Sequence, residues 1–194
     1  VESGDVVVVK GKTVVPEEKK VYLAFNKPRG IVCTAEKREK NNVIDYLSYP
    51  VRIYPVGRLD KDSEGLLLMT NDGDIINQMM RAANRHEKEY QVEVNKEITP
   101  EFLKKMASGV PILDTVTRPC RIRKTGERSF TIILTQGLNR QIRRMCEALG
   151  YRVTKLKRVR IMNIHLKDLK TGEYRPLTEK ELAELKKQIG EEKR

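Results

Sequence analysis

The sequence predicts an α+β fold in which a largely antiparallel sheet is flanked by helices. Strand-like and helix-like segments mix without the regular alternation that parallel βαβ units produce. Several pairs of strand-like segments are separated by short turns, and a short turn can join only antiparallel neighbours. A chain of 194 residues can bury a substantial core, so we expect one domain with at most a small appendage.

The first twenty residues form that appendage. Val6–Val9 and Thr13–Val15 predict two short strands around a glycine turn. This pattern resembles the last hairpin of an S4 RNA-binding module, and an ordinary edge hairpin fits the residues as well. The charged segment Pro16–Lys20 predicts a linker. We therefore expect residues 1–20 to be the remnant of an S4-like domain with its linker, and residues 21–194 to form the main domain. The chain does not begin with methionine, which suggests a fragment.

The main domain begins with a buried-type strand, Val21–Phe25. A turn with Pro28 and Gly30 ends it, because proline cannot continue a strand ladder and glycine relieves the backbone. Apolar residues then follow helical spacing over 43–47, and Pro50 stops that helix.

A polar, charged segment then runs directly into an apolar run, Leu66–Thr70. Asp60 lies in the polar part, so we expect its carboxylate on a loop just before a buried strand, where the core can fix its position. Arg58 and Lys61 flank it, and a nearby cation keeps a partly buried carboxylate ionised. An ionised aspartate can attack carbon or take a proton, whereas the commoner role of a loop aspartate is to cap a turn. Asp72 is expected to cap the helix that follows.

Period-two alternation over Lys88–Val94 predicts a strand with Tyr90 on its apolar face. The alternation alone makes Tyr90 a core aromatic, but a tyrosine at the start of a core strand can also leave one ring face open to a stacked base. Thr99 is expected to cap a helix that Gly109 ends. The remaining elements are expected as strands over 118–123, 129–135 and 151–164 and as helices over 139–150 and 178–189.

Two of these later elements carry basic residues. In the helix that Asn139 is expected to cap, Arg140 and Arg143 fall away from the apolar face. The segment 151–164 alternates basic with apolar residues and predicts a strand with a strongly basic edge. This strand is the densest candidate for contacts to an RNA backbone.

Three segments, in this chain order, resemble the motifs of RNA pseudouridine synthases of the RsuA type. They are Gly57-Arg58-Leu59-Asp60 with Ser63-Glu64-Gly65-Leu66, then Lys88-Glu89-Tyr90, then Gly137-Leu138-Asn139-Arg140-Gln141-Ile142-Arg143-Arg144-Met145. The turn Asn26-Lys27-Pro28-Arg29-Gly30 also matches the start of that family's domain. The resemblance covers roughly residues 22–182, and segments 81–90 and 160–163 look closest to the RluF subgroup, which acts on the RNA of the large ribosomal subunit.

The resemblance implies the pseudouridine synthase fold, a bent central sheet with a catalytic cleft across it. It also implies an isomerase that converts uridine to pseudouridine in ribosomal RNA, with 23S rRNA expected first and 16S rRNA or tRNA as alternatives. Asp60 would be the nucleophile or base, Tyr90 would stack on the uracil, and Arg143 would clamp Asp60 through its forked donors. The sequence leaves open whether Asp60 acts at C1′, at C6 or on the ribose.

The target uridine would have to be flipped out of its helix, and Arg58 is expected to fill the vacated stack. The other candidates for RNA contact are Lys27, Lys88, Asn139, Arg140 and Arg144. An isomerisation needs no cofactor, and the chain carries no phosphate-loop or dinucleotide motif.

Composition sets further expectations. The 39 basic and 27 acidic side chains give a net charge of +12, which points to a polyanion: RNA, DNA or an anionic membrane. No segment approaches the ~18 apolar residues of a membrane span, and no signal peptide opens the chain, so we expect a cytoplasmic protein without a membrane partner. Three scattered cysteines and two histidines without ligand-spaced partners predict no disulfide frame and no metal.

We expect ribosomal RNA as the partner, free or within an assembling large subunit, and no obligate protein partner. The competing hypothesis is a non-catalytic RNA-binding or ribosome-assembly protein on the same scaffold. That hypothesis explains the charge equally well. It gives no reason for an aspartate and a tyrosine to stand at their motif positions together with an arginine.

Overall fold

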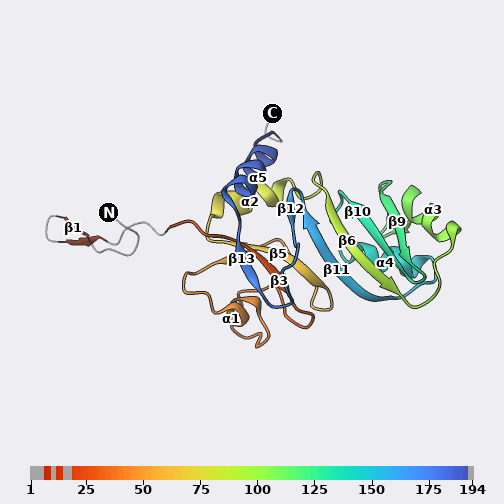
Figure 1. Cartoon of the computed structure of the whole chain (residues 1–194), viewed down its shortest axis with the longest axis horizontal. Coiled ribbons are helices and arrows are strands. Elements are labelled where there is room, and N and C mark those ends of the chain that lie inside the picture. Colours follow the sequence, from red (N-terminus) through yellow and green to blue (C-terminus); the bar gives the residue numbers. More distant parts are fainter. Residues whose placement is uncertain (1–6, 10–11, 15–18, 192–194) are drawn as a thin grey trace.

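The computed structural model describes residues 7–9, 12–14 and 19–191. A nine-stranded sheet runs through the body in the order β13-β3-β5-β11-β6-β10-β9, with β4 paired to β5 and β12 paired to β11 (Figure 1). Every pairing in this sheet is antiparallel except that of β5 with β11. The predicted α+β class with a largely antiparallel sheet is therefore confirmed. No helix of the described part of the chain is long and apolar enough to cross a membrane.

The parallel β5–β11 pairing, called the seam below, divides the sheet into two halves (Figure 1). The first half contains β3 (Tyr22–Lys27), β4 (Tyr54–Val56), β5 (Glu64–Thr70) and β13 (Tyr174–Pro176). The second half contains β6 (Lys88–Val94), β9 (Arg121–Gly126), β10 (Ser129–Leu134), β11 (Val153–Ile161) and β12 (Ile164–His165). The helices are α1 (Val43–Leu47), α2 (Gly73–Arg81), α3 (Pro100–Ser108), α4 (Gln141–Ala148) and α5 (Glu179–Glu191).

Two hairpins lie outside the large sheet. β7 (Pro111–Ile112) pairs with β8 (Thr115–Val116), and β1 (Val7–Val9) pairs with β2 (Lys12–Val14). The β1–β2 hairpin is the one predicted for the appendage. The other residues of that appendage up to position 18 lie outside the described residues, and an S4-like origin stays a prediction.

In the first half of the sheet, β3 and β5 are buried on both faces, which explains the continuous apolar run in β5. Leu66 and Leu68 pack with residues of α2 and α5. Leu67 and Met69 point to the opposite face, where they pack beside Val43 of α1. A strand covered on both sides has no solvent face, so its sequence shows no alternation.

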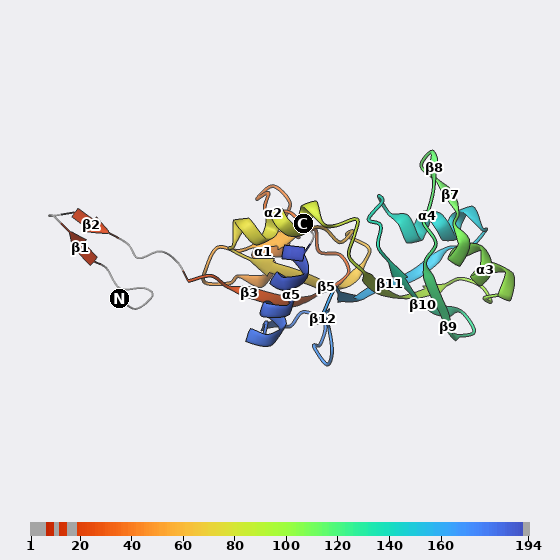
Figure 2. The same ribbon diagram turned by 90° about the horizontal axis from the view of Figure 1, so that it is seen from above.

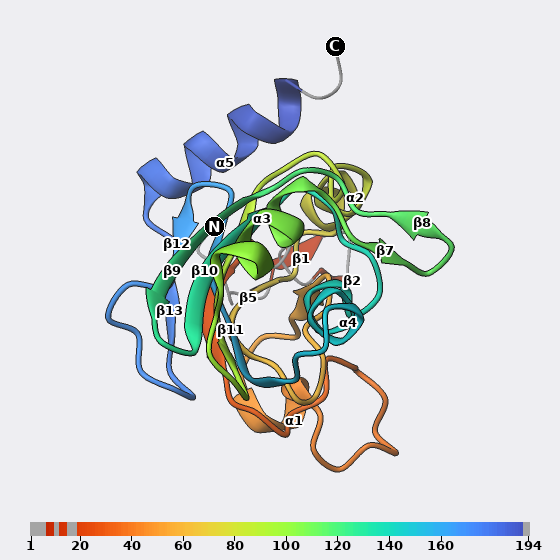
Figure 3. The ribbon, with the colours of Figure 1, turned by 90° about the vertical axis from the view of Figure 1, so that its right-hand side faces the viewer.

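The second half is buried on one face, and its strands alternate accordingly. Val92 and Val94 of β6 and Phe130 and Ile132 of β10 pack against α3 and α4, while intervening residues such as Glu93 are exposed. The predicted period-two pattern of Lys88–Val94 is thus confirmed. Viewed from above and along the long axis, α2 and α4 lie on the same side of the sheet (Figures 2 and 3). These two helices flank the seam from that side.

The helix caps follow local sequence. Asp72 accepts a hydrogen bond from the backbone N of Ile75 at 3.3 Å, and Thr99 accepts one from Phe102 at 3.1 Å. Both caps satisfy backbone donors that the first helical turn leaves free, and both were predicted. Gly109 ends α3, also as predicted.

The strand predicted over 151–164 is found as β11, which is an interior strand between β5 and β6. Two of its basic residues pair with carboxylates of neighbouring strands: Lys155 lies 3.9 Å from Glu64, and Arg160 lies 3.3 Å from Glu89. Contact of this strand with an RNA backbone stays a prediction.

The seam depends on a glycine. Only Lys157 with Glu64 and Arg158 with Gly65 are in register across it. Gly65 has a φ of +109°, and a Cβ there would lie 2.2 Å from the carbonyl oxygen of Arg158. The two backbones can approach this closely because Gly65 carries no side chain.

Glu181 stabilises the start of α5 and gives a testable prediction. Its carboxylate accepts two hydrogen bonds from Arg175, at 2.8 and 3.0 Å, and one from the backbone N of Thr178 at 2.9 Å. The Arg175 hydrogen bonds are the main cause that lowers the pKa of Glu181 to about 2. We expect Glu181→Gln to lower the free energy of unfolding by about 1–2 kcal/mol at pH 7.

Because the folded-state pKa is depressed, this stabilisation is complete above the ordinary pKa of 4.5 and is lost as the pH falls toward about 2. Urea unfolding of both proteins at neutral pH and across that acid range measures the difference. A difference that stays constant as the pH falls would contradict the assignment to this charge.

Candidate active site

A cleft of about 520 Å³ lies where the two halves of the sheet meet. The loop before β5 contributes Arg58 and Asp60, and β6 contributes Lys88 and Tyr90. Arg158 of β11 lines the cleft between them, the end of α2 with Met79 and Met80 forms one wall, and segment 136–142 leading into α4 forms another. Asp60 and Tyr90, predicted from separate motifs, therefore line the same cleft from opposite sides of the seam.

The loop that carries Asp60 is tied to the core on both sides. Leu59 is buried, and its backbone N donates to the sulfur of Cys33 at 3.4 Å. A turn closes with the backbone N of Ser63 donating to the carbonyl of Asp60 at 3.0 Å. The carbonyl of Lys61 accepts from the backbone N of Gly30 at 2.7 Å, so the Asn26–Gly30 turn braces the loop. These bonds fix the backbone from which the Asp60 side chain projects.

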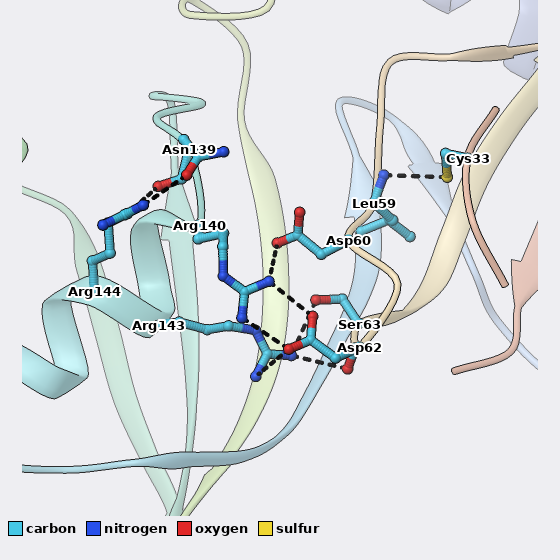
Figure 4. A network of polar contacts seen from close by, with 9 residues as sticks. All are labelled: Cys33, Leu59, Asp60, Asp62, Ser63, Asn139, Arg140, Arg143 and Arg144. Carbon is cyan, nitrogen blue, oxygen red and sulfur yellow. Dashed lines mark hydrogen bonds and ion pairs between the residues drawn. The ribbon is translucent and has the colours of Figure 1, made fainter. Parts of the chain in front are cut away.

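Two arginines of the α4 region reach this loop (Figure 4). Arg140 binds Asp62 with two hydrogen bonds of 3.0 and 2.8 Å, and its Nη1 lies 3.4 Å from Oδ2 of Asp60. Arg143 is buried beneath them, where its Nη2 donates to the carbonyl of Asp62 at 2.9 Å and to Oγ of Ser63 at 3.2 Å. The Arg140 hydrogen bonds are the main cause that holds the pKa of Asp62 below its usual range.

The structure differs from the prediction in which arginine meets Asp60. Arg143, the expected clamp, makes its hydrogen bonds and ion pair with Asp62 and Ser63 (Figure 4). Arg140, expected to contact RNA, is the residue ion-paired with Asp60. Arg140 stands at the cap position of α4 with a left-handed backbone, so helical spacing alone does not indicate that it reaches Asp60.

Lys27 was predicted to contact RNA, and the structure contradicts this. Its side chain is fully buried at 0% exposure, and its Nζ donates to the carbonyls of Pro28 and Ile31 at 2.9 and 2.7 Å. Burial is the main cause that lowers its pKa. The ammonium group closes the turn from inside, because a buried cation needs acceptors and these carbonyls supply them.

Asn139 was predicted to cap α4, and this is also wrong. Arg140 occupies the cap position with a left-handed backbone, φ 49° and ψ 39°, and no side chain caps the helix. Asn139 instead accepts two hydrogen bonds from Arg144, at 3.0 Å on its carbonyl and 2.9 Å on Oδ1. Asn139 is exposed at the cleft, so RNA contact by Asn139 and Arg144 stays a prediction.

The remaining candidates lie in the cleft itself. Arg58 is exposed and has no ion pair with the described residues, and its place in the vacated stack stays a prediction. Lys88 points inward and donates to the carbonyl of Ala83 at 2.5 Å and that of Thr135 at 3.5 Å. Burial, followed by the charges of Arg158 and Arg118, lowers the pKa of Lys88 to about 8.

Arg158 belongs to the basic segment 151–164 that the sequence indicated for RNA contact, but its place in the cleft was not predicted. Its side chain is 6% exposed, and its Nε donates to the carbonyl of Leu66 across the seam at 2.9 Å. The available signal was its spacing, two residues after the buried Leu156 on the same face of β11. Within the described ranges, no group of three or more His, Cys, Asp or Glu residues could hold a metal ion.

A family model described as RNA pseudouridylate synthase matches residues 21–148. The chain belongs to the RNA pseudouridylate synthase family. Among curated relatives of this chain, the dual-specificity RNA pseudouridine synthase RluF of Salmonella typhi is 53% identical over 191 residues, which is 97% of this chain and 66% of the relative. The ribosomal large subunit pseudouridine synthase B of Bacillus subtilis is 36% identical over 194 residues, 96% of this chain and 79% of that relative.

Comparison with solved structures identifies the same fold. A solved structure described as a pseudouridylate synthase superposes with a TM-score of 0.79 at 28% identity, covering 95% of this chain and 82% of the other. The predicted fold and the predicted resemblance to RsuA-type, RluF-like synthases are confirmed. This chain spans 66% of the length of the RluF relatives that it matches.

Proposed function

We propose that this chain isomerises uridine to pseudouridine in RNA, and that 23S ribosomal RNA is its substrate. The observation that carries the proposal is the convergence of Asp60 and Tyr90 on one cleft from the two halves of the sheet. Membership of the pseudouridylate synthase family supports it. A non-catalytic RNA-binding protein would need neither the carboxylate nor the phenol at this place.

The proposed chemistry uses groups that the cleft already contains. The N1–C1′ bond of uridine breaks, the uracil turns while it stays bound, and a C5–C1′ bond forms. Asp60 acts as nucleophile or base, and Tyr90 stacks on the uracil. Arg140 pairs with Asp60, and Arg143 positions the loop from beneath. Atoms are only rearranged, so the step requires no redox cofactor.

A base inside a helix cannot present C1′ and C5 to the cleft, so the target must be flipped out at a cost of a few kcal/mol. Arg58, exposed at the cleft wall, would fill the vacated stack. The names of the relatives support the choice of RNA: one set is called dual-specificity, and another is named for the large ribosomal subunit. Such a substrate would place the protein in the cytoplasm, acting on free RNA or on an assembling large subunit.

The test incubates the protein with separate 23S rRNA, 16S rRNA and tRNA preparations that lack pseudouridine. Carbodiimide adducts read by primer extension then map any product. We expect a discrete site in 23S rRNA. Product only in 16S rRNA or tRNA would overturn the substrate while keeping the activity. Absence of product in all three would reject the activity and favour the RNA-binding alternative.

A further inference from the structure

Three side chains share the floor of the cleft. Tyr90 of β6 lies directly opposite Arg158 of β11 in the antiparallel register, and cross-strand partners project to the same face. Lys88 precedes Tyr90 by two residues and therefore projects to that face as well. All three line the cleft.

Neither cation of this floor is neutralised by a carboxylate of the described residues. Lys88 donates only to the carbonyls of Ala83 and Thr135, and an ammonium group has a third donor. Arg158 donates through Nε to the carbonyl of Leu66. Its Nη2 is shielded from solvent and has no hydrogen-bond partner in the described part of the chain. Buried charge without a counter-ion is costly in the free protein, so it calls for an explanation.

The acidic groups near this floor already have partners. Asp60 is paired with Arg140, and Glu87, which also lines the cleft, is paired with Arg121 and Arg160. The remaining charged or titratable groups around Lys88 are Arg118, His86 and Arg58. The positive charges of Lys88 and Arg158 are therefore available to a ligand that binds in the cleft.

We propose that Lys88, supported by the charge of Arg158, stabilises the negative charge that develops on the uracil during the isomerisation. This inference rests on the proposed function. When the N1–C1′ bond breaks, its electron pair stays with the uracil and spreads onto the O2 and O4 carbonyls. Formation of the C5–C1′ bond uses that electron density, C5 loses a proton to a base, and N1 gains one. If Asp60 instead adds to C6, the charge again moves onto the O4 carbonyl.

Preorganised donors aimed at developing charge typically contribute 10²–10³-fold each to the rate, because a site closed to water strengthens them. Lys88 is suited to this role only while it is protonated. Burial and the charges of Arg158 and Arg118 lower its pKa to about 8, so the ammonium form is lost as the pH rises through that value. The catalytic step should slow above it.

The experiment measures single-turnover rates on the RNA that the wild type modifies. Lys88→Met is expected to slow the step by ~10²–10³-fold. Its RNA affinity, measured in an Asp60→Asn background to prevent turnover, should change little. Lys88→Arg should recover part of the rate. A Lys88→Met protein that loses affinity but reacts normally once bound would overturn the proposal and make Lys88 a phosphate contact.

Arg118→Gln provides the matched control. Arg118 does not line the cleft, yet its charge lowers the pKa of Lys88. The variant should keep the wild-type rate at pH 7 and should shift the alkaline decline to higher pH. NMR titration of the Lys88 Cε resonance in the free protein should show the same shift, and this measurement holds even if Lys88→Met fails to fold. An active wild type whose alkaline decline does not move in Arg118→Gln contradicts the role of Lys88. An inactive wild type contradicts the proposed function itself.

Discussion

Asp60→Asn is expected to abolish pseudouridine formation while RNA affinity stays nearly unchanged. Asparagine keeps the size and the hydrogen-bonding oxygen of the side chain but cannot supply the nucleophilic or basic carboxylate that the reaction needs. Arg140 lies 3.4 Å from the Asp60 carboxylate and 2.8 Å from the Asp62 carboxylate. Because the shorter contact to Asp62 remains in the variant, the loop should keep its shape. Single-turnover product assays measure the activity, and fluorescence anisotropy with the same RNA measures the affinity.

Asp62→Asn is the matched control because the two aspartates are neighbours with the same arginine. Asp62 makes the stronger contacts to Arg140 but does not line the cleft. We expect this variant to react more slowly, because Arg140 loses its anchor, and still to form product. Comparable product from Asp60→Asn, or complete loss only in Asp62→Asn, would remove Asp60 from the mechanism.

Gly65→Ala is expected to be the most destabilising single-methyl change in the seam. The added Cβ would lie 2.2 Å from the Arg158 carbonyl and 2.7 Å from its nitrogen, and both are backbone atoms that cannot rotate away. The backbone conformation, φ +109°, also strains any residue with a side chain. We expect a loss of ~3 kcal/mol or more in the free energy of unfolding, measured by urea denaturation.

Gly73→Ala is the control for this change. Gly73 is the first residue of α2, has open space around an added Cβ and has no left-handed backbone. Alanine there should be neutral or stabilise by ~0.5–1 kcal/mol. If Gly65→Ala unfolded at the same urea concentration as the wild type, the seam would not be as tight as described.

The parts predicted correctly from sequence are those whose causes are local. The caps at Asp72 and Thr99 each depend on residues within one helical turn, and both are confirmed. Tyr90 was placed on the apolar face by alternation alone, and that alternation holds because β6 is covered on one side only.

The errors have causes that are distant in the chain. Lys27 stands in a basic turn, and only the folding of that turn around its ammonium group shows that the charge is buried. The ion pairs of Lys155 and Arg160 on β11 were not foreseen, because they depend on carboxylates of β5 and β6 that the seam and the antiparallel register bring beside them. Which arginine reaches Asp60 depends on the left-handed backbone of Arg140, which helical periodicity does not predict.

The seam also separates the side chains that line the cleft into two groups, one from each half of the sheet. Asp60 belongs to one half of the sheet, Tyr90 and Lys88 belong to the other, and strand pairing between the halves involves two residue pairs in the described part of the chain. Arg140 and Arg143, from the α4 side, both donate hydrogen bonds to Asp62 and so connect the two halves. The distance between the Asp60 carboxylate and the Tyr90 phenol therefore depends on how the two halves are joined, and not on the packing of either half alone.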